Sequence, residues 1–210
     1  ISAKIMKAFG MEAEQLARVN DVLVSTFTRA NTDLTMLAEG LKHVAPLANT
    51  MGVSIEDTTA VLAKFADAGF QGEMGGTALR NILSRLGGAF PRTIGELSRV
   101  GVTTLDTTGK MRPLLDVLQE VEDAGLSAGE VMKIFGQRGG PQLLALLEVG
   151  IGEVRKFSEE TSRMGGVTAR MQEARMKTMK GQWQELTSLI EGVVLQIGSE
   201  LAPYVTRLID

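Results

Sequence analysis

Length, composition and charge already exclude several classes of protein. The 210 residues include no cysteine and a single histidine, which removes disulfide frameworks, thiolate metal sites and two-histidine metal motifs. The formal net charge of −3 comes from acids and bases mixed along the chain, and it provides no field that would attract nucleic acid. Only 4% of the residues are aromatic, so we expect a core of aliphatic side chains, which favours helices.

The start of the chain carries no targeting signal. It begins with Ile1 and has neither a basic leader nor a long apolar run, so we expect no signal peptide and a fragment of a longer protein. A membrane span needs about 18 or more consecutive apolar residues. The closest candidate, residues 192–199, is far shorter and is bordered by Glu191 and Glu200.

Helical spacing dominates the first half of the chain. Apolar residues at steps of three and four predict an amphipathic helix from Leu34 to Met51. Gly52 is placed to end it in the left-handed conformation, and Ser54 to cap a second helix that reaches Gly69. A third helix is expected to begin near Thr77 and to end before residues 87–91, where two glycines and a proline follow.

The pattern changes over residues 100–111. β-Branched residues there flank an Asp-Thr-Thr-Gly turn, which is compatible with a short β-hairpin, marginal by itself. Helix resumes at Pro113, and Ser127 with Glu130 has the capping pattern of a further helix, which ends near Gly136. The order helix, Gly-apolar-Ser, helix, double glycine, helix therefore occurs twice, as a recurring construction.

A long final helix is expected beyond residues 165–166 and should kink or end at Pro203. Its apolar residues alternate in steps of four and three, as in a coiled coil. This C-terminal stripe consists of Met179, Trp183, Leu186, Ile190, Val193 and Ile197. It packs either within the same chain or against a second copy, and the sequence does not favour one over the other. The prediction is an all-α fold with a lead-in over 1–32, a helical core over 33–148 and a long helical segment over 149–210.

Closely spaced glycines in residues 67–80, DAGFQGEMGGTALR, raise the question of a phosphate site. A phosphate-binding P-loop follows a strand and ends in a lysine and a hydroxyl, but here helix precedes the glycines and no lysine stands before Thr77. We therefore expect no nucleotide and no other cofactor, and interpret the glycines as allowing turns and close helix approach. Arg80 is interpreted as a solvated or salt-bridged side chain.

A DNA-binding regulator is the alternative function. Residues 48–54 match the local pattern of a helix-turn-helix reader, with a glycine and a serine in the turn between two helices. The side chains that would face phosphate are Glu56 and Asp57, whose charge argues against DNA. His43 has no flanking acid, so we interpret it as a surface or half-buried helix residue and expect no catalytic site.

A membrane-active helix bundle is the third reading of the sequence. The amphipathic segment 183–208 would lie at the membrane interface. Glu185, Glu191 and Glu200 would repel anionic lipid, which disfavours this reading.

Residues 37–86 resemble the core region of bacteriophage tail tape measure proteins. That family shows a helix, a Gly-apolar-Ser turn as at Gly52 and Ser54, an alanine-rich helix and then N-A-G-apolar-x-G-x-x-A-G-T-A-L-R. The residues that fit this signature are Ala68, Gly69, Gly72, Gly76, Thr77, Ala78, Leu79 and Arg80. Asp67 replaces the usual asparagine and Gly75 the usual alanine, which puts the local packing in question. The likeness continues through Phe135, Gly136 and the glycine pair before the last helix, over roughly residues 20–205.

The resemblance implies a structural virion component in the lumen of the tail tube, not an enzyme. Such a protein determines tail length, scaffolds tail assembly and leaves during genome ejection. The implied partners are further copies of itself, tail tube or tail tip proteins and tail assembly chaperones, with host envelope contact through other parts of the full-length protein. No sequence-specific nucleic acid is implied, and the location is the virion, or the host cytoplasm during assembly.

Helical rise gives that role a physical basis. A helix advances about 1.5 Å per residue, so an extended helical chain converts residue count into distance. The 24 glycines of this sequence argue against one uniform helical rod over these residues. We therefore expect this region to be the folded, hairpin-rich part, while helices outside it measure.

Overall fold

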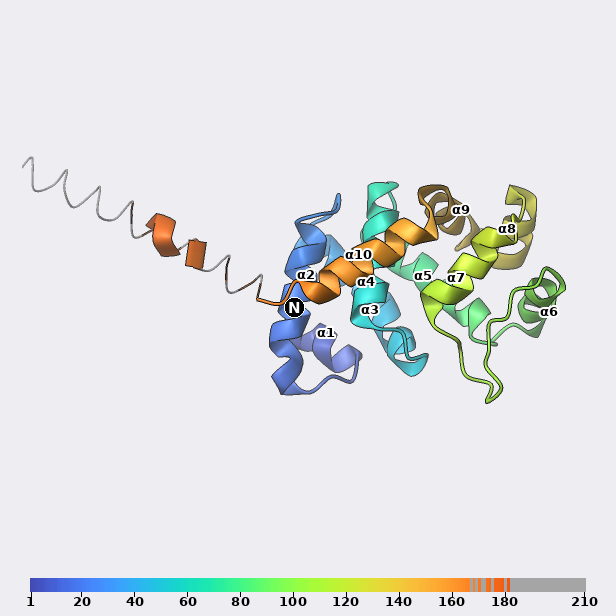
Figure 1. Cartoon of the computed structure of the whole chain (residues 1–210), viewed down its shortest axis with the longest axis horizontal. Helices are drawn as coiled ribbons and strands as arrows, with labels where there is room; N and C mark the ends of the chain where they lie inside the picture. Colours follow the sequence, from blue (N-terminus) through green and yellow to red (C-terminus); the bar gives the residue numbers. More distant parts are fainter. Residues whose placement is uncertain (167, 169, 171–172, 175, 180, 182–210) are drawn as a thin grey trace, which may run out of the picture. The chain divides into compact units, whose positions relative to one another are not determined.

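The structure is a computed structural model, which describes residues 1–166 together with 168, 170, 173, 174, 176–179 and 181. Helices connected by loops, the longest of them between α6 and α7, make up most of this part of the chain (Figure 1). In chain order they are α1 (Ser2–Ala8), the 3-10 helix η1 (Ala13–Gln15), α2 (Leu16–Phe27), α3 (Leu34–Thr50), α4 (Ile55–Asp67), α5 (Gly72–Leu86), α6 (Pro91–Arg99), α7 (Leu114–Asp123), α8 (Ala128–Phe135), α9 (Gly140–Val149) and α10 (Ile151–Arg163). The predicted all-α class is confirmed.

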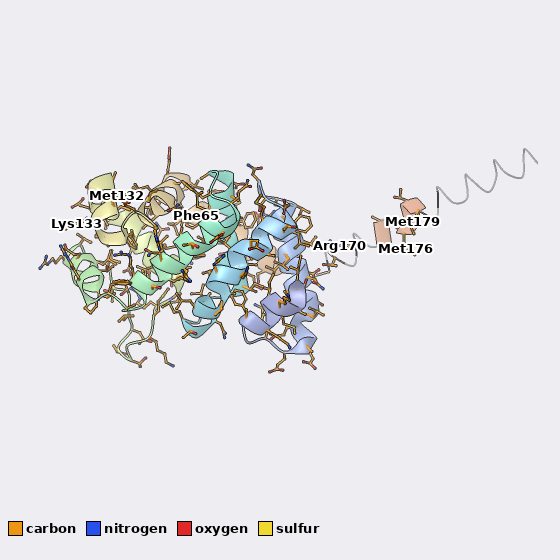
Figure 2. All side chains as sticks on the ribbon, turned by 180° about the vertical axis from the view of Figure 1, so that it is seen from behind. Phe65, Met132, Lys133, Arg170, Met176 and Met179 are labelled. Carbon is orange, nitrogen blue, oxygen red and sulfur yellow. The ribbon has the colours of Figure 1, made fainter. Side chains whose placement is uncertain are left out.

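Helix α4 is the central helix of the core. It contacts α2, α3, α5, α9 and α10, and all its residues except Asp57, Lys64 and Asp67 are buried. Most of the buried side chains are alanine, threonine, valine or leucine, which are small enough for neighbouring helices to approach from several sides. Phe65 is the largest of them and is 0% exposed; Figure 2 shows it among the packed helices. The packing therefore surrounds α4 and leaves little of it in contact with solvent.

Two turns of the same design connect α3 to α4 and α7 to α8. Gly52 and Gly125 have positive φ angles of 73° and 60°, which glycine adopts without steric cost. Two residues later, Ser54 and Ser127 accept a backbone N–H at the start of the next helix. Only the second turn has a full capping box, in which Glu130 accepts from the Ser127 hydroxyl and backbone, and the pKa of Glu130 is lowered by the Ser127 hydroxyl.

Residues 100–111 form a loop with one β-bridge. Leu105 pairs with Met111 in an isolated antiparallel bridge, and no strand occurs among the described residues. The Asp106 carboxylate closes the turn by accepting from the Thr108 hydroxyl at 2.7 Å and the Lys110 N–H at 3.0 Å. The predicted β-hairpin is thus reduced to a single bridge. Its ladder ends because Pro113, which has no N–H to donate, caps α7 immediately afterwards.

One predicted helix boundary needs correction, and one helix was not predicted. Helix α5 begins at Gly72, not near Thr77, so Gly75 and Gly76 lie inside it. Each glycine lowers intrinsic helix propensity by about 1 kcal/mol, which is why the sequence pattern pointed to a later start. Helix α6 was not predicted, because Pro91 was interpreted only as a helix end. Proline is equally suited to the first helical position, which is where Pro91 stands.

Two compact units divide the chain, Ile1–Val167 and Thr168–Asp210. The first includes the predicted lead-in and also α10, which packs on α2, α4, α7 and α9. Arg29, two residues after the end of α2, holds α10 through an ion pair with Glu160 and through its guanidinium, which lies 4.4 Å from the centre of the Phe157 ring. Long-range packing therefore joins residues 1–32 and 151–163 to the helical core.

Candidate functional site

Helices α3 and α5 meet at two glycines, Gly40 and Gly76. A Cβ atom added to Gly76 would lie 2.7 Å from both the Cα and the carbonyl carbon of Gly40, and still closer to its carbonyl oxygen. A Cβ on Gly40 would lie 3.1 Å from the carbonyl oxygen of Gly72. Backbone thus contacts backbone with no side chain between the helices, and Gly76 is the position where a methyl group cannot fit. We call this contact the glycine crossing.

The other glycines of the cluster shape the entry into the crossing. A Cβ on Gly75 would lie 2.6 Å from the carbonyl oxygen of Phe70, in the turn that leads into α5. Gly69 lies in that turn, which directly follows α4, and Gly72 is the first residue of α5. A helix, not a strand, therefore precedes the glycines, and the narrow space they leave is filled by the backbone of α3 and of the turn. The structure offers no phosphate cradle at these residues.

The remaining signature residues divide between the core and the surface. Leu79 is 0% exposed and Ala78 is also buried. Thr77 is half-buried, and its hydroxyl has no hydrogen bond to any described residue. Arg80 is exposed, and within the described part of the chain no acid pairs with it. Packing therefore explains the apolar residues of the signature but not its two polar ones.

Arg85 connects α5 to α8, a role that sequence analysis missed. Its Nη1 donates to the carbonyl oxygen of Ile134 at 2.6 Å, and its Nε donates to the Asn81 side chain at 3.1 Å. The guanidinium carbon lies 4.8 Å from the centre of the Phe90 ring. A Cβ on Gly136 would lie 3.1 Å from Nη2, so the glycine after α8 leaves room for this arginine. Gly136 was noted in the sequence, but its role in leaving room for Arg85 becomes clear only once the position of α8 is known.

Replacing Arg85 with alanine should destabilise the protein by about 2 kcal/mol, because a charged hydrogen bond to a C-terminal carbonyl of α8 is lost. Urea unfolding followed by circular dichroism measures the change. Arg92→Ala is the matched control: Arg92 is exposed on α6 and has no ion pair with a described residue. We expect a change below about 0.5 kcal/mol there. Equal effects at both positions would contradict the bridging role of Arg85.

A family model described as phage-related minor tail protein matches residues 1–192. The chain belongs to this family. It is 29% identical over 213 residues to the tape measure protein of Pneumococcus phage Dp-1, covering 99% of this chain and 18% of the relative. It is also 29% identical over 195 residues to the probable tape measure protein of Escherichia phage P2, covering 89% of this chain and 24% of the relative.

A third relative extends the comparison to another host. The probable tape measure protein of Halomonas phage phiHAP-1 is 26% identical over 211 residues, covering 94% of this chain and 24% of the relative. The chain therefore spans 18% to 24% of the length of these three tail proteins. No solved structure matches the chain. The family match includes the glycine crossing, Arg85 and α10.

In this minor tail protein segment, the helix that would read DNA is α4. Its burial prevents it from entering a major groove, which needs an exposed helix. Glu56, predicted to face phosphate, is 5% exposed and binds Arg18 through both carboxylate oxygens, at 2.8 and 2.9 Å. This hydrogen-bonded carboxylate raises the pKa of Arg18. The structure therefore corrects the helix-turn-helix interpretation, because the helix that would read DNA is packed into the hydrophobic core.

The single histidine of the chain makes one long contact with an acidic side chain. His43 lies on α3 with Nε2 3.9 Å from Glu73 Oε1. Within the residues that the structure describes, no group of three or more histidine and acidic side chains could hold a metal ion. The same residues contain no helix with both the length and the apolarity that crossing a membrane requires.

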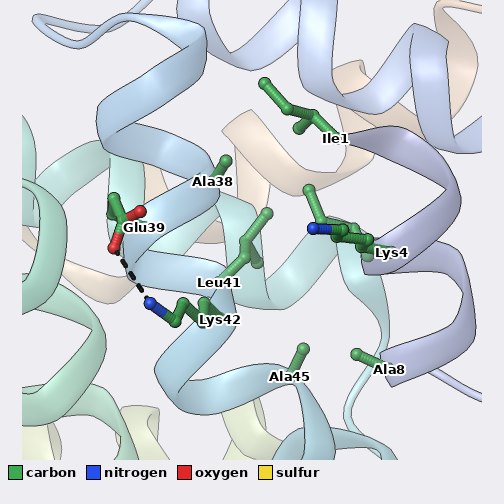
Figure 3. A pocket seen from close by; sticks show the side chains of 9 residues that line it. Ile1, Lys4, Ala8, Ala38, Glu39, Leu41, Lys42 and Ala45 are labelled. Atoms are coloured by element: carbon green, nitrogen blue, oxygen red, sulfur yellow. Dashed lines mark ion pairs between the residues drawn. The ribbon is translucent and has the colours of Figure 1, made fainter.

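A groove between α1 and α3 has mainly aliphatic walls (Figure 3). Its volume is about 390 Å³, and Ile5, Leu41 and Ala45 are among its lining residues. The charged side chains along it include Lys42, which pairs with Glu39 on the same helix at 3.7 Å (Figure 3). Because most of its lining residues are aliphatic, the groove offers mainly apolar contact.

The predicted C-terminal stripe falls largely outside the described residues. Met179 is described and is 63% exposed, as is Met176; both are labelled in Figure 2. Trp183, Leu186, Ile190, Val193 and Ile197 lie outside the described residues. Self-association through this stripe therefore stays a prediction.

Proposed function

We propose that this chain is the folded core of a phage tail tape measure protein, a structural virion component without enzymatic activity. The observation that carries the proposal is the family match over residues 1–192 together with three relatives named tape measure protein or probable tape measure protein. The parent protein determines tail length in the lumen of the tail tube, scaffolds assembly and leaves during genome ejection. Its partners are tail tube or tail tip proteins, assembly chaperones and further copies of itself.

The fold indicates which part of the parent protein measures length and which part contacts other tail components. A measuring segment needs extended helix, in which distance follows residue count at about 1.5 Å per residue. Residues 1–166 instead bury an apolar core among short helices, of which the longest, α3, has 17 residues. We therefore assign these residues to contacts with other tail components, and measurement to helical segments of the parent protein outside them.

Tail length in electron micrographs tests the proposal. Deleting a predicted helical stretch of the parent gene outside this segment should shorten tails by about 1.5 Å per deleted residue. The control is Gly95→Ala inside this segment, at a helical glycine with no atom near its added Cβ, which should leave tail length unchanged. Tails of normal length after the deletion would contradict the tape measure function.

A further inference from the structure

The exposed face of α5 contains the two polar signature residues that the fold does not use, Thr77 and Arg80, together with Glu73 one turn before them. Glu73, Thr77 and Arg80 follow one another at steps of four and three, so they lie on the same side of the helix. Glu73 and Arg80 are exposed, and Met74 beside them is 55% exposed although methionine is apolar. Neither the Thr77 hydroxyl nor the Arg80 guanidinium has a partner among the described residues. We call these four residues the α5 face.

The charges of the α5 face are complementary to those of a second copy in the reverse direction. Glu73 is negative and Arg80 positive, and seven residues place them about 10 Å apart along the helix. A two-fold axis perpendicular to α5 relates the helix to an antiparallel copy of itself. Glu73 then lies against Arg80 of the second copy, and Arg80 lies against Glu73 of the second copy. Each interface thus contains two opposite-charge pairs, as an isologous contact requires.

We propose that α5 pairs antiparallel with α5 of a second copy of this chain, about a two-fold axis beside Thr77. The midpoint between Glu73 and Arg80 lies next to Thr77, so the two Thr77 hydroxyls face each other and can exchange a hydrogen bond. Met74 is the flexible apolar side chain at the edge of the contact. This inference does not depend on the tape measure function.

The surroundings of the α5 face leave it open to such a partner. A hollow of about 550 Å³ adjoins it, lined by Glu73, Met74, Thr77, Gln137, Arg138 and Gln142. His43, 3.9 Å from Glu73, makes only a long contact with the carboxylate. Exposed ion pairs are weak, so the contact should be reversible and of low affinity. Covalent trapping therefore detects it better than a measurement of mass alone.

A single introduced cysteine gives a clean test, because the chain has none of its own. Thr77→Cys should form a disulfide-linked dimer under mild oxidation, since residues beside the axis come within the roughly 7 Å between Cα atoms that a disulfide needs. Arg92→Cys, on the exposed surface of α6, is the control and should cross-link only at the rate of random collision.

Charge reversal in the Thr77→Cys background then tests the register. Glu73→Arg or Arg80→Glu alone should slow cross-linking by about tenfold, because each creates two like-charge pairs. The double variant Glu73→Arg/Arg80→Glu should return the rate to within about twofold of the parent, because opposite charges face each other again. Circular dichroism checks that each variant is folded.

Three results would overturn the proposal: cross-linking no faster than that of Arg92→Cys, a rate insensitive to the single reversals, or no recovery in the double variant. A cross-linking rate that does not change when the charges are reversed would indicate association through another surface, such as the C-terminal stripe. These measurements use the isolated chain in solution. Their failure would therefore leave the tail-length experiment, and the proposed function, unaffected.

Discussion

Replacing Gly76 with alanine should destabilise the protein by about 2–3 kcal/mol, although alanine is the better helix former. The added Cβ would lie 2.7 Å from both the Cα and the carbonyl carbon of Gly40, and backbone cannot rotate away as a flexible side chain can. Helices α3 and α5 would have to move apart, which loosens the contacts of both with α4. The gain in helix propensity, about 1 kcal/mol, offsets only part of this loss. The midpoint of urea denaturation measures the difference.

Gly95→Ala is the matched control for the glycine crossing. Gly95 also lies inside a helix, α6, but an added Cβ there meets no atom within 4 Å. Only the propensity term operates at that position, so we expect stabilisation by about 0.5–1 kcal/mol. If Gly76→Ala were also stabilising, the close approach of α3 and α5 would be wrong.

Replacing Phe135 with alanine should have the largest effect, a loss of about 3–5 kcal/mol. Phe135 is the last residue of α8 and is 0% exposed. Its removal would leave a cavity beside the point where Arg85 holds the neighbouring Ile134 carbonyl, so α8 would lose packing where it is joined to α5. Both the urea midpoint and the melting temperature should fall, in the same direction.

Phe90 provides the control for that substitution. It is 42% exposed, and its ring makes a cation–π contact with Arg85. Truncation to alanine should reduce stability by only about 0.5–1 kcal/mol, the range of an exposed cation–π contact. Similar losses at Phe90 and Phe135 would show that α8 does not depend on the buried ring for its anchorage.

Local pattern was sufficient for most elements of the fold. Helical spacing predicted the helix beginning at Leu34, and the capping residues Ser54 and Ser127 stand where helices α4 and α8 begin. The start of α5 was misplaced because glycine is a poor helix former in isolation, and α6 was missed because proline both ends and begins helices. Propensity is a local quantity, and at these two places packing or position outweighs it.

Sequence patterns predicted only some residues of the candidate site. Gly76 was identified through the family signature, whereas its counterpart Gly40 was not, because a lone glycine in an amphipathic helix carries no sign of its partner. Glu56 was considered only as a residue that would face phosphate in a helix-turn-helix, because no residue near it in the sequence indicates its ion pair with Arg18. Arg85 was missed for the same reason, because the carbonyl that it binds belongs to α8.

The sequence by itself determined the all-α class, the absence of cysteine chemistry and the resemblance to phage tail proteins, since each depends on residue type and short-range spacing. Only the tertiary structure decided that α4 is buried, that Gly40 meets Gly76 and that Arg85 joins α5 to α8. Those features depend on which surfaces meet after the chain folds. Contact between distant residues is selected by the burial of whole helix faces, which no local pattern encodes.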